Sequence, residues 1–200
     1  MEWGRTTTST ALLEGLLRDD DSTIWAEFDD RYRPILLAFA RKLGCDEEDA
    51  HDVAQETLTQ FVRDYRRGMY DRTKGRLSSW ILGIAHHRAL DVHRRRGRRA
   101  EHRGDSAFLH LSKPDELERA WNEECRAAII QRALRDMVRL RNMNERTVEA
   151  FRRQAFDQQD PKTVASDLGM TEQAAYLAKH RCLKAMREII SELTIAYELL

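Results

Sequence analysis

Six side chains that suit contacts with nucleic acid recur at helical spacing near the C-terminal end of the sequence. Residues three and four positions apart lie on one face of an α-helix, so a helix here would present all six together. Amide, aromatic, imidazole and basic groups on one face can contact base edges and phosphates in a DNA major groove. The six residues are Gln173, Tyr176, Leu177, His180, Arg181 and Lys184.

The residues around this face predict two helices separated by a tight turn. We expect a short helix over 161–168, a turn at Gly169 that requires tolerance of positive φ, and a long helix from Thr171 to at least Leu193. This is the pattern of a helix-turn-helix that reads DNA. An ordinary helical hairpin with a polar outer face has the same pattern, and both interpretations stay open. The inward positions are Val164, Ala165, Leu168, Ala175, Ala178 and Cys182.

A second surface is suggested by the distribution of charge. The formal net charge of the 200 residues is zero, yet residues 46–56 hold six acids and no lysine or arginine. Residues 88–103 hold seven arginines against Asp91 and Glu101, which gives 7 − 2 = +5. A chain with such separated charges is expected to have one basic and one anionic partner.

Aromatic residues lie close to a basic loop in the middle of the chain. Aromatic rings beside positive charge can stack on unpaired bases. For Phe61 and Trp80, positions on an apolar helical stripe favour core packing over base stacking. Tyr70, Lys74 and Arg76 lie off that stripe and remain candidates for contacts with nucleic acid.

Histidines and cysteines do not form a recognisable metal or catalytic pattern. His86 and His87 are adjacent, so on a helix they point about 100° apart and cannot chelate one ion together. The three cysteines, Cys45, Cys125 and Cys182, form no C-x-x-C pair and are expected to be free thiols, buried or partly buried. No nucleophile elbow, phosphate-binding loop or dinucleotide fingerprint is present, so we expect no enzyme, no cofactor and no metal.

The composition and periodicity predict an all-α protein of two small helical domains. The chain is 42% hydrophobic and 34% charged, with only nine glycines and three prolines. Helical stripes are predicted over 24–43, 46–65, 77–96, from 116, and over 145–156. We place one domain at 10–97, a flexible linker at 98–116 and the second domain at 117–193. The apolar stretches are too short for a signal peptide or a membrane span, so we expect a cytoplasmic protein without membrane contact.

Three segments follow one another along the chain: DAHDVAQETLTQFVRDY, YDRTKGRLSSWILGIAHHRALDVHRRR and RTVEAFRRQAFDQQDPKTVASDLGMTEQAAYLAKHRCLKAMREII. In this order they resemble the bacterial extracytoplasmic-function (ECF) sigma factors of the sigma-70 family. The resemblance covers about residues 20–190. It implies two helical domains, sigma region 2 and a sigma region 4 helix-turn-helix, that bind core RNA polymerase and direct it to promoters.

The resemblance implies a role for the acidic helix. Asp52, Gln55 and Glu56 match the D-x-x-Q-E motif that docks on the clamp helices of the largest polymerase subunit. The expected polymerase-binding residues are Asp49, Asp52, Gln55, Glu56, Thr59 and Gln60. Further implied partners are the flap of the second-largest subunit, promoter DNA and possible binding of an anti-sigma factor.

The resemblance also implies two sets of DNA contacts. The minus-ten element of the promoter would be melted and held by Tyr70, Lys74, Arg76, His86, Arg94 and Arg95, with the last two as phosphate contacts. The minus-thirty-five element would be read by the six residues of the C-terminal helix face. The acidic D-x-x-Q-E helix favours this function over the alternative, a helix-turn-helix regulator that acts without core polymerase.

Overall fold

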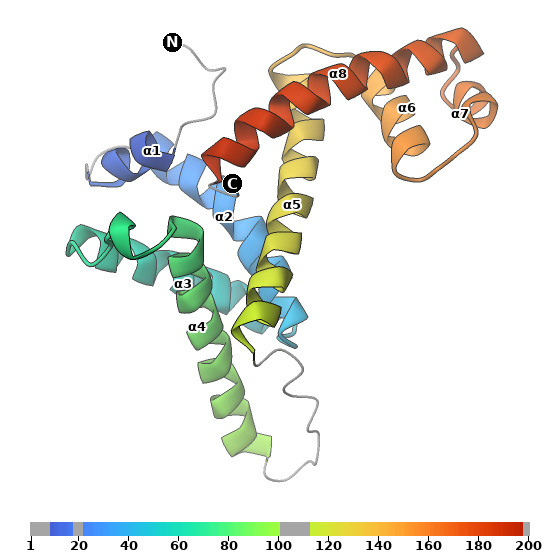
Figure 1. The fold of residues 1–200 in the computed structure, drawn as a ribbon. Helices are drawn as coiled ribbons and strands as arrows, with labels where there is room; N and C mark the ends of the chain where they lie inside the picture. Colours follow the sequence, from blue (N-terminus) through green and yellow to red (C-terminus); the bar gives the residue numbers. More distant parts are fainter. Residues whose placement is uncertain (1–8, 18–21, 101–112, 198–200) are drawn as a thin grey trace. The chain divides into compact units, whose positions relative to one another are not determined.

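The computed structural model describes residues 9–17, 22–100 and 113–197, and every regular element in these ranges is helical (Figure 1). The predicted all-α class is therefore confirmed. The elements are α1 (Ser9–Leu16), α2 (Ser22–Lys42), α3 (Glu47–Arg66), the 3-10 helix η1 (Arg72–Lys74), α4 (Leu77–Ala100), α5 (Pro114–Arg139), α6 (Glu145–Ala155), α7 (Pro161–Asp167) and α8 (Glu172–Ala196).

The chain divides into two compact units. We call residues 7–128 with 196–200 the N-terminal unit, and residues 129–195 the C-terminal unit. In the N-terminal unit, α3 packs against both α2 and α4. Its core is aromatic at the centre, where the Phe28 ring of α2 stacks on the Phe61 ring of α3 at a centroid distance of 4.8 Å.

Helix α3 begins where the sequence predicts because its N-terminus is capped. The Asp46 carboxylate accepts a hydrogen bond from the Asp49 amide at 2.9 Å, and three acids in the first turn favour the positive end of the helix dipole. The preceding helix ends at Lys42, and Gly44 adopts a φ of 88° that suits glycine. These local signals fix the direction in which α3 leaves α2.

The first half of α5 belongs to the N-terminal unit. The buried Trp121 ring packs edge-on against Phe39 of α2 at 5.4 Å. Lys42 Nζ reaches Glu123 at 2.5 Å and Glu124 at 3.0 Å. The division by contacts therefore falls between Ala128 and Ile129, inside a continuous helix.

The flexible linker that the sequence predicts at 98–116 stays a prediction. Of that segment, residues 98–100 are part of α4 and residues 114–116 are part of α5. Residues 101–112 lie outside the described part of the chain. The linker was predicted from the glycine, serine and proline content of this stretch. The two compact units instead divide after Ala128, because Trp121 packs against Phe39 of α2, a contact that local composition cannot predict.

The last described residues pack on α2 of the N-terminal unit. The fully buried guanidinium of Arg31 donates a hydrogen bond to the Ala196 carbonyl at 2.8 Å and pairs with Glu27 at 3.1 Å. Its charge lies 5.3 Å from the centroid of the Tyr197 ring, which is only 2% exposed. A buried arginine requires such partners, because an unpaired charge in the core is costly.

The C-terminal unit contains the two helices and the turn that the sequence predicts around Gly169. Helix α7 is capped by Asp160, and the Thr171 hydroxyl accepts a hydrogen bond from the Ala174 amide at 3.1 Å at the start of α8. Gly169 has a φ of 59°, a conformation that favours glycine. The core of the unit includes Ala150, Val164 and Ala178.

The cysteines are free and buried, as predicted. Burial raises the pKa of Cys45 to about 11, of Cys125 to about 12 and of Cys182 to about 11, so the thiols are protonated at neutral pH. Among the described residues, no helix is both long enough and apolar enough to cross a membrane.

Removing the Tyr197 ring is expected to destabilise the N-terminal unit. Tyr197→Ala should lower its free energy of unfolding by about 2 kcal/mol, since a buried ring and a cation–π contact are lost. Denaturant unfolding followed by tryptophan fluorescence measures this, because Trp25, Trp80 and Trp121 all lie in this unit. Ile195→Ala, which removes a side chain of a residue that is 58% exposed, is the control. Equal stability of the two variants would contradict the packing of Tyr197 against Arg31 of α2.

Candidate functional site

The residues predicted to bind polymerase on α3 divide into two groups. Asp52, Gln55 and Thr59 are exposed and lie three and four positions apart, so they form one stripe on the helix surface. We call these three residues the α3 stripe. Gln55 Nε2 lies 3.5 Å from Thr59 Oγ1, and Asp52 has no ion pair within the described residues.

The other three predicted residues are engaged inside the N-terminal unit. Asp49 forms an ion pair with Arg96 of α4. Glu56 lies 3.8 Å from both Arg88 and Arg95 of α4. Gln60 donates a hydrogen bond to Asp64 at 2.7 Å. The acidic cluster therefore serves two purposes: part of it holds α4 against α3, and the rest faces solvent.

These pairs change the interpretation of the arginines at the end of α4. Arg94 has a side chain that is 69% exposed, and its guanidinium lies 3.3 Å from Asp91. Arg95 is 53% exposed and shares Glu56 with Arg88. Arg88 also lies 3.5 Å from Asp91. Both predicted phosphate contacts are therefore paired with an acid, and Arg94 is the more exposed of the two.

Sequence reasoning missed the contribution of α2 to this surface. Arg33 donates hydrogen bonds to Asp29 at 2.6–2.9 Å and to Gln55 at 2.9 Å. The bonds to Asp29 raise the pKa of Arg33, so its guanidinium remains charged. The i, i+4 spacing of Asp29 and Arg33 was visible in the sequence, but their link to Gln55 depends on the packing of α2 on α3.

A pocket of about 330 Å³ opens at the loop before α4. Three of the residues predicted for the minus-ten element, Tyr70, Lys74 and Arg76, line it. The loop is held locally: Asp71 accepts a hydrogen bond from the Thr73 amide at 2.9 Å, and Tyr70 Oη donates to the Gly75 carbonyl at 3.4 Å. The other lining residues are Met69, Asp71, Gly75, Ser79 and Trp80.

One wall of this pocket continues the aromatic core. Phe61 is fully buried, as core packing predicts, and its ring meets Trp80 at 5.2 Å. The half-buried Trp80 then stacks on Tyr70 with a centroid distance of 5.2 Å and an interplanar angle of 13°. Trp80 thus contacts the core through Phe61 and also lines the pocket. Its position on the apolar helical stripe predicted only the contact with the core.

The remaining residues predicted for the minus-ten element do not line the pocket. Arg94 and Arg95 lie about 20 Å further along α4, at 1.5 Å per residue from Trp80. His86 is half-buried, and burial together with His87 lowers its pKa, so its imidazole is neutral at pH 7. The predicted set therefore separates into a pocket at the start of α4 and a basic region at its end.

The predicted reading face on α8 is exposed throughout. All six residues of this face are exposed, including the large side chains of Tyr176 and Leu177. Ala175, Ala178 and Cys182, the predicted inward positions, are buried. The helix therefore presents the face expected from the sequence.

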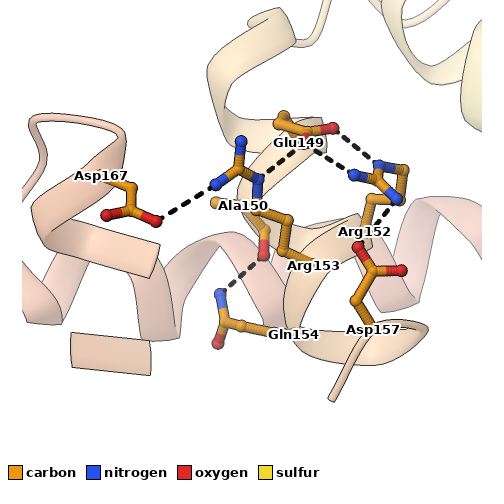
Figure 2. A network of polar contacts seen from close by, with 7 residues as sticks. All are labelled: Glu149, Ala150, Arg152, Arg153, Gln154, Asp157 and Asp167. Carbon is orange, nitrogen blue, oxygen red and sulfur yellow. Dashed lines mark hydrogen bonds and ion pairs between the residues drawn. The ribbon is translucent and has the colours of Figure 1, made fainter. Parts of the chain in front are cut away.

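A network of charges links α6 to α7 (Figure 2), and a buried amide links α6 to α8. Glu149 accepts hydrogen bonds from Arg152 at 2.8 Å and from Arg153 at 2.7 Å, and Arg153 also reaches Asp167 of α7 at 3.4 Å. The buried Gln154 donates to the carbonyls of Ala150 at 2.9 Å and of Ala175 in α8 at 3.0 Å. Helix α8 is thereby oriented from its buried side.

The described residues contain no cluster of three or more histidine, cysteine or acidic side chains placed to hold a metal ion. His86 and His87 point apart, with ring centroids separated by 6.0 Å. Cys45 Sγ lies 3.7 Å from His93 Nε2.

The part of the chain that carries the α3 stripe and the pocket is similar to a known protein family. Residues 28–99 match Sigma-70 region 2. This match supports a sigma factor of the sigma-70 family with a role in transcription initiation, and it implies interaction with core RNA polymerase and promoter DNA. No curated protein matches the chain. The match ends before α5, so the function expected for α7 and α8 stays a prediction.

The network around Glu149 predicts a pH-dependent contribution to stability. Hydrogen bonds from Arg152 and Arg153 lower the pKa of Glu149 from 4.5 to about 2. A lowered pKa in the folded state stabilises the protein above about pH 4.5, and this stabilisation is lost as the pH falls toward 2. Glu149→Gln should therefore be less stable than wild type at pH 7, with a difference that narrows below pH 4.5.

Thermal unfolding followed by circular dichroism between pH 7 and pH 3 measures this difference. Glu145→Gln, which removes an acid of α6 that has no ion pair among the described residues, is the control. A gap between Glu149→Gln and wild type that stays constant across this range would refute the role of the carboxylate.

Proposed function

We propose that this chain is an ECF-type sigma factor, which binds core RNA polymerase and directs promoter-specific initiation of transcription. The observation that carries the proposal is the match of residues 28–99 to Sigma-70 region 2. The match includes the whole of α3, with its exposed stripe, and the aromatic pocket before α4. The protein acts by binding and by melting DNA rather than by catalysing a reaction of its own.

The α3 stripe is the contact with polymerase in this proposal. Asp52 and Gln55 offer a carboxylate and an amide to a basic partner surface, the clamp helices of the largest subunit. Glu56 and Asp49 contribute indirectly, because their ion pairs with α4 arginines fix the helix that carries the stripe. Arg33 contributes by orienting Gln55 through their 2.9 Å hydrogen bond.

The pocket before α4 is the proposed acceptor of an unpaired base from the minus-ten element. Extruding a base costs a few kcal/mol, so a preformed stacking surface must offset that cost. The half-buried Trp80 and Tyr70 rings supply such a surface, since stacking of a base on an aromatic ring is worth about 1–3 kcal/mol. Lys74 and Arg76 at its rim supply positive charge for the adjacent phosphates.

Helices α7 and α8 are the proposed reader of the minus-thirty-five element. Capped and oriented as described, they have the arrangement of a helix-turn-helix whose second helix enters the major groove. On the exposed face, Arg181 and Lys184 suit phosphates or guanine, while Tyr176 and Leu177 suit thymine methyl groups. In this proposal, binding of the α8 face to the minus-thirty-five element determines which promoters the polymerase uses.

Reversing the charge of Asp52 is the sharpest test of the polymerase contact. Asp52→Lys should weaken equilibrium binding to core RNA polymerase by about tenfold or more, since a favourable charge contact becomes a repulsion. Glu118→Lys, which makes the same change on the exposed side of α5, is the matched control. Glu56→Lys is avoided because a lysine there would face Arg88 and Arg95. Equal binding by both variants, with unchanged circular dichroism, would contradict the assignment.

The two arginines at the end of α4 are expected to differ in their salt dependence. For the polymerase complex on promoter DNA, Arg94→Gln should reduce the slope of log affinity against log salt by about 0.7–0.9, the value for one phosphate contact. Arg95→Gln should have a smaller effect because the Arg95 side chain is less exposed, at 53% against 69% for Arg94. Titrations over a range of salt concentrations measure both slopes. Identical slopes for Arg94→Gln and wild type would remove Arg94 from the DNA contacts.

A further inference from the structure

A larger pocket lies between α2 and α3, beside the α3 stripe. Its volume is about 610 Å³, which lies within the range of pockets that hold small organic molecules. Trp25 of α2 and Leu58 and Val62 of α3 supply apolar walls. None of the expectations drawn from the sequence concerned this pocket, because it forms only where the two helices pack together.

The rim of this pocket has an excess of positive charge. Four arginines line it, against the single carboxylate of Asp29. Asp29 is not available to neutralise them, because both of its oxygens accept hydrogen bonds from Arg33. The other three arginines, at the C-terminal end of α3, are Arg63, Arg66 and Arg67.

Two of these arginines are free to meet a ligand. Arg63 is exposed, and the hydrogen bond that it donates to Gln60 is long, at 3.5 Å. Arg67 is exposed and has no ion pair within the described part of the chain. Arg66 is already committed: it donates to the Leu16 carbonyl at 3.2 Å, and its charge lies 6.0 Å from the centroid of the Trp25 ring. That contact joins the charged rim to the apolar wall.

We propose that this pocket binds a small amphipathic anion: a carboxylate, sulfonate or phosphate carried on an aromatic or aliphatic body. The body packs against Trp25, Leu58 and Val62, and the anionic group accepts hydrogen bonds from Arg63 and Arg67. An arginine fork can donate two parallel hydrogen bonds to two oxygens of any of these groups.

An anion bound in this pocket would regulate the binding of core polymerase to the neighbouring α3 stripe. Gln55 and Thr59 of the α3 stripe also line it, so a bound anion occupies space beside the proposed polymerase contact. Anion and core polymerase should therefore exclude each other. This second step rests on the proposed function, whereas binding of the anion does not.

The fluorescent probe 1-anilinonaphthalene-8-sulfonate tests the site directly, because it joins an aromatic body to a sulfonate. With the full chain, its fluorescence should rise to saturation with one probe bound. The double variant Arg63→Gln with Arg67→Gln should weaken this binding by about five- to tenfold, since two exposed charge contacts are lost. The matched control is Arg119→Gln with Arg126→Gln, which removes two exposed arginines of α5.

An uncharged analogue, N-phenyl-1-naphthylamine, separates the charge from the apolar contact. Its affinity should be the same in wild type and in the double variant at Arg63 and Arg67. Unchanged affinity of the sulfonate in that variant, or an equal loss in the α5 control, would overturn the site. An equal loss for the uncharged analogue would also overturn it, because the effect would then not depend on the anionic group.

Competition with core RNA polymerase tests the regulatory step. Addition of core should displace the sulfonate from the wild-type chain. A ternary complex that keeps the probe bound would overturn the exclusion. If the chain alone does not bind core, the proposed function fails, yet probe binding that depends on Arg63 and Arg67 would still establish the anion site.

Discussion

The stack of Phe28 on Phe61 is the contact on which the N-terminal unit depends. It joins α2 to α3. The Phe61 ring also contacts the Trp80 ring of α4, and Trp80 stacks on Tyr70 of the loop before α4. One row of rings thus runs from the core to the surface. Because the rings are rigid and close-packed, the pocket before α4 is already formed in the folded chain, so the proposed binding of a base does not have to order it.

Charge then decides which surfaces remain available on this core. Arg88, Arg95 and Arg96 of α4 hold Glu56 and Asp49 of α3, whereas Asp52 on the same helix stays exposed to solvent. At the other end of α3 the arginines outnumber the acids. Acids at the N-terminal end and arginines at the C-terminal end of α3 both interact favourably with the helix dipole. The two ends of the helix therefore offer separate surfaces, one to a basic partner and one to an anionic partner.

The all-helical class, the helix over 46–65 and the turn at Gly169 could be predicted because each depends on local chemistry: apolar spacing along a helix and a residue that tolerates positive φ. The exposed face of α8 followed from the same periodicity. What could not be predicted depends on pairs distant in sequence. The place of Trp121 in the N-terminal unit, the burial of Arg31 under Tyr197 and the pocket between α2 and α3 have no local signal. For the same reason, six candidate residues on α3 appeared equivalent in sequence, and only their partners on α2 and α4 separate them.

We propose that the chain gives core RNA polymerase its choice of start site. This is tested by transcription reconstituted from purified core polymerase, the purified chain and fragmented genomic DNA, with mapping of the transcript starts. We expect the chain to produce a set of defined starts that are absent with core alone and that share sequence elements near minus ten and minus thirty-five. Starts that are unchanged by addition of the chain, under conditions in which the chain is folded, would contradict it.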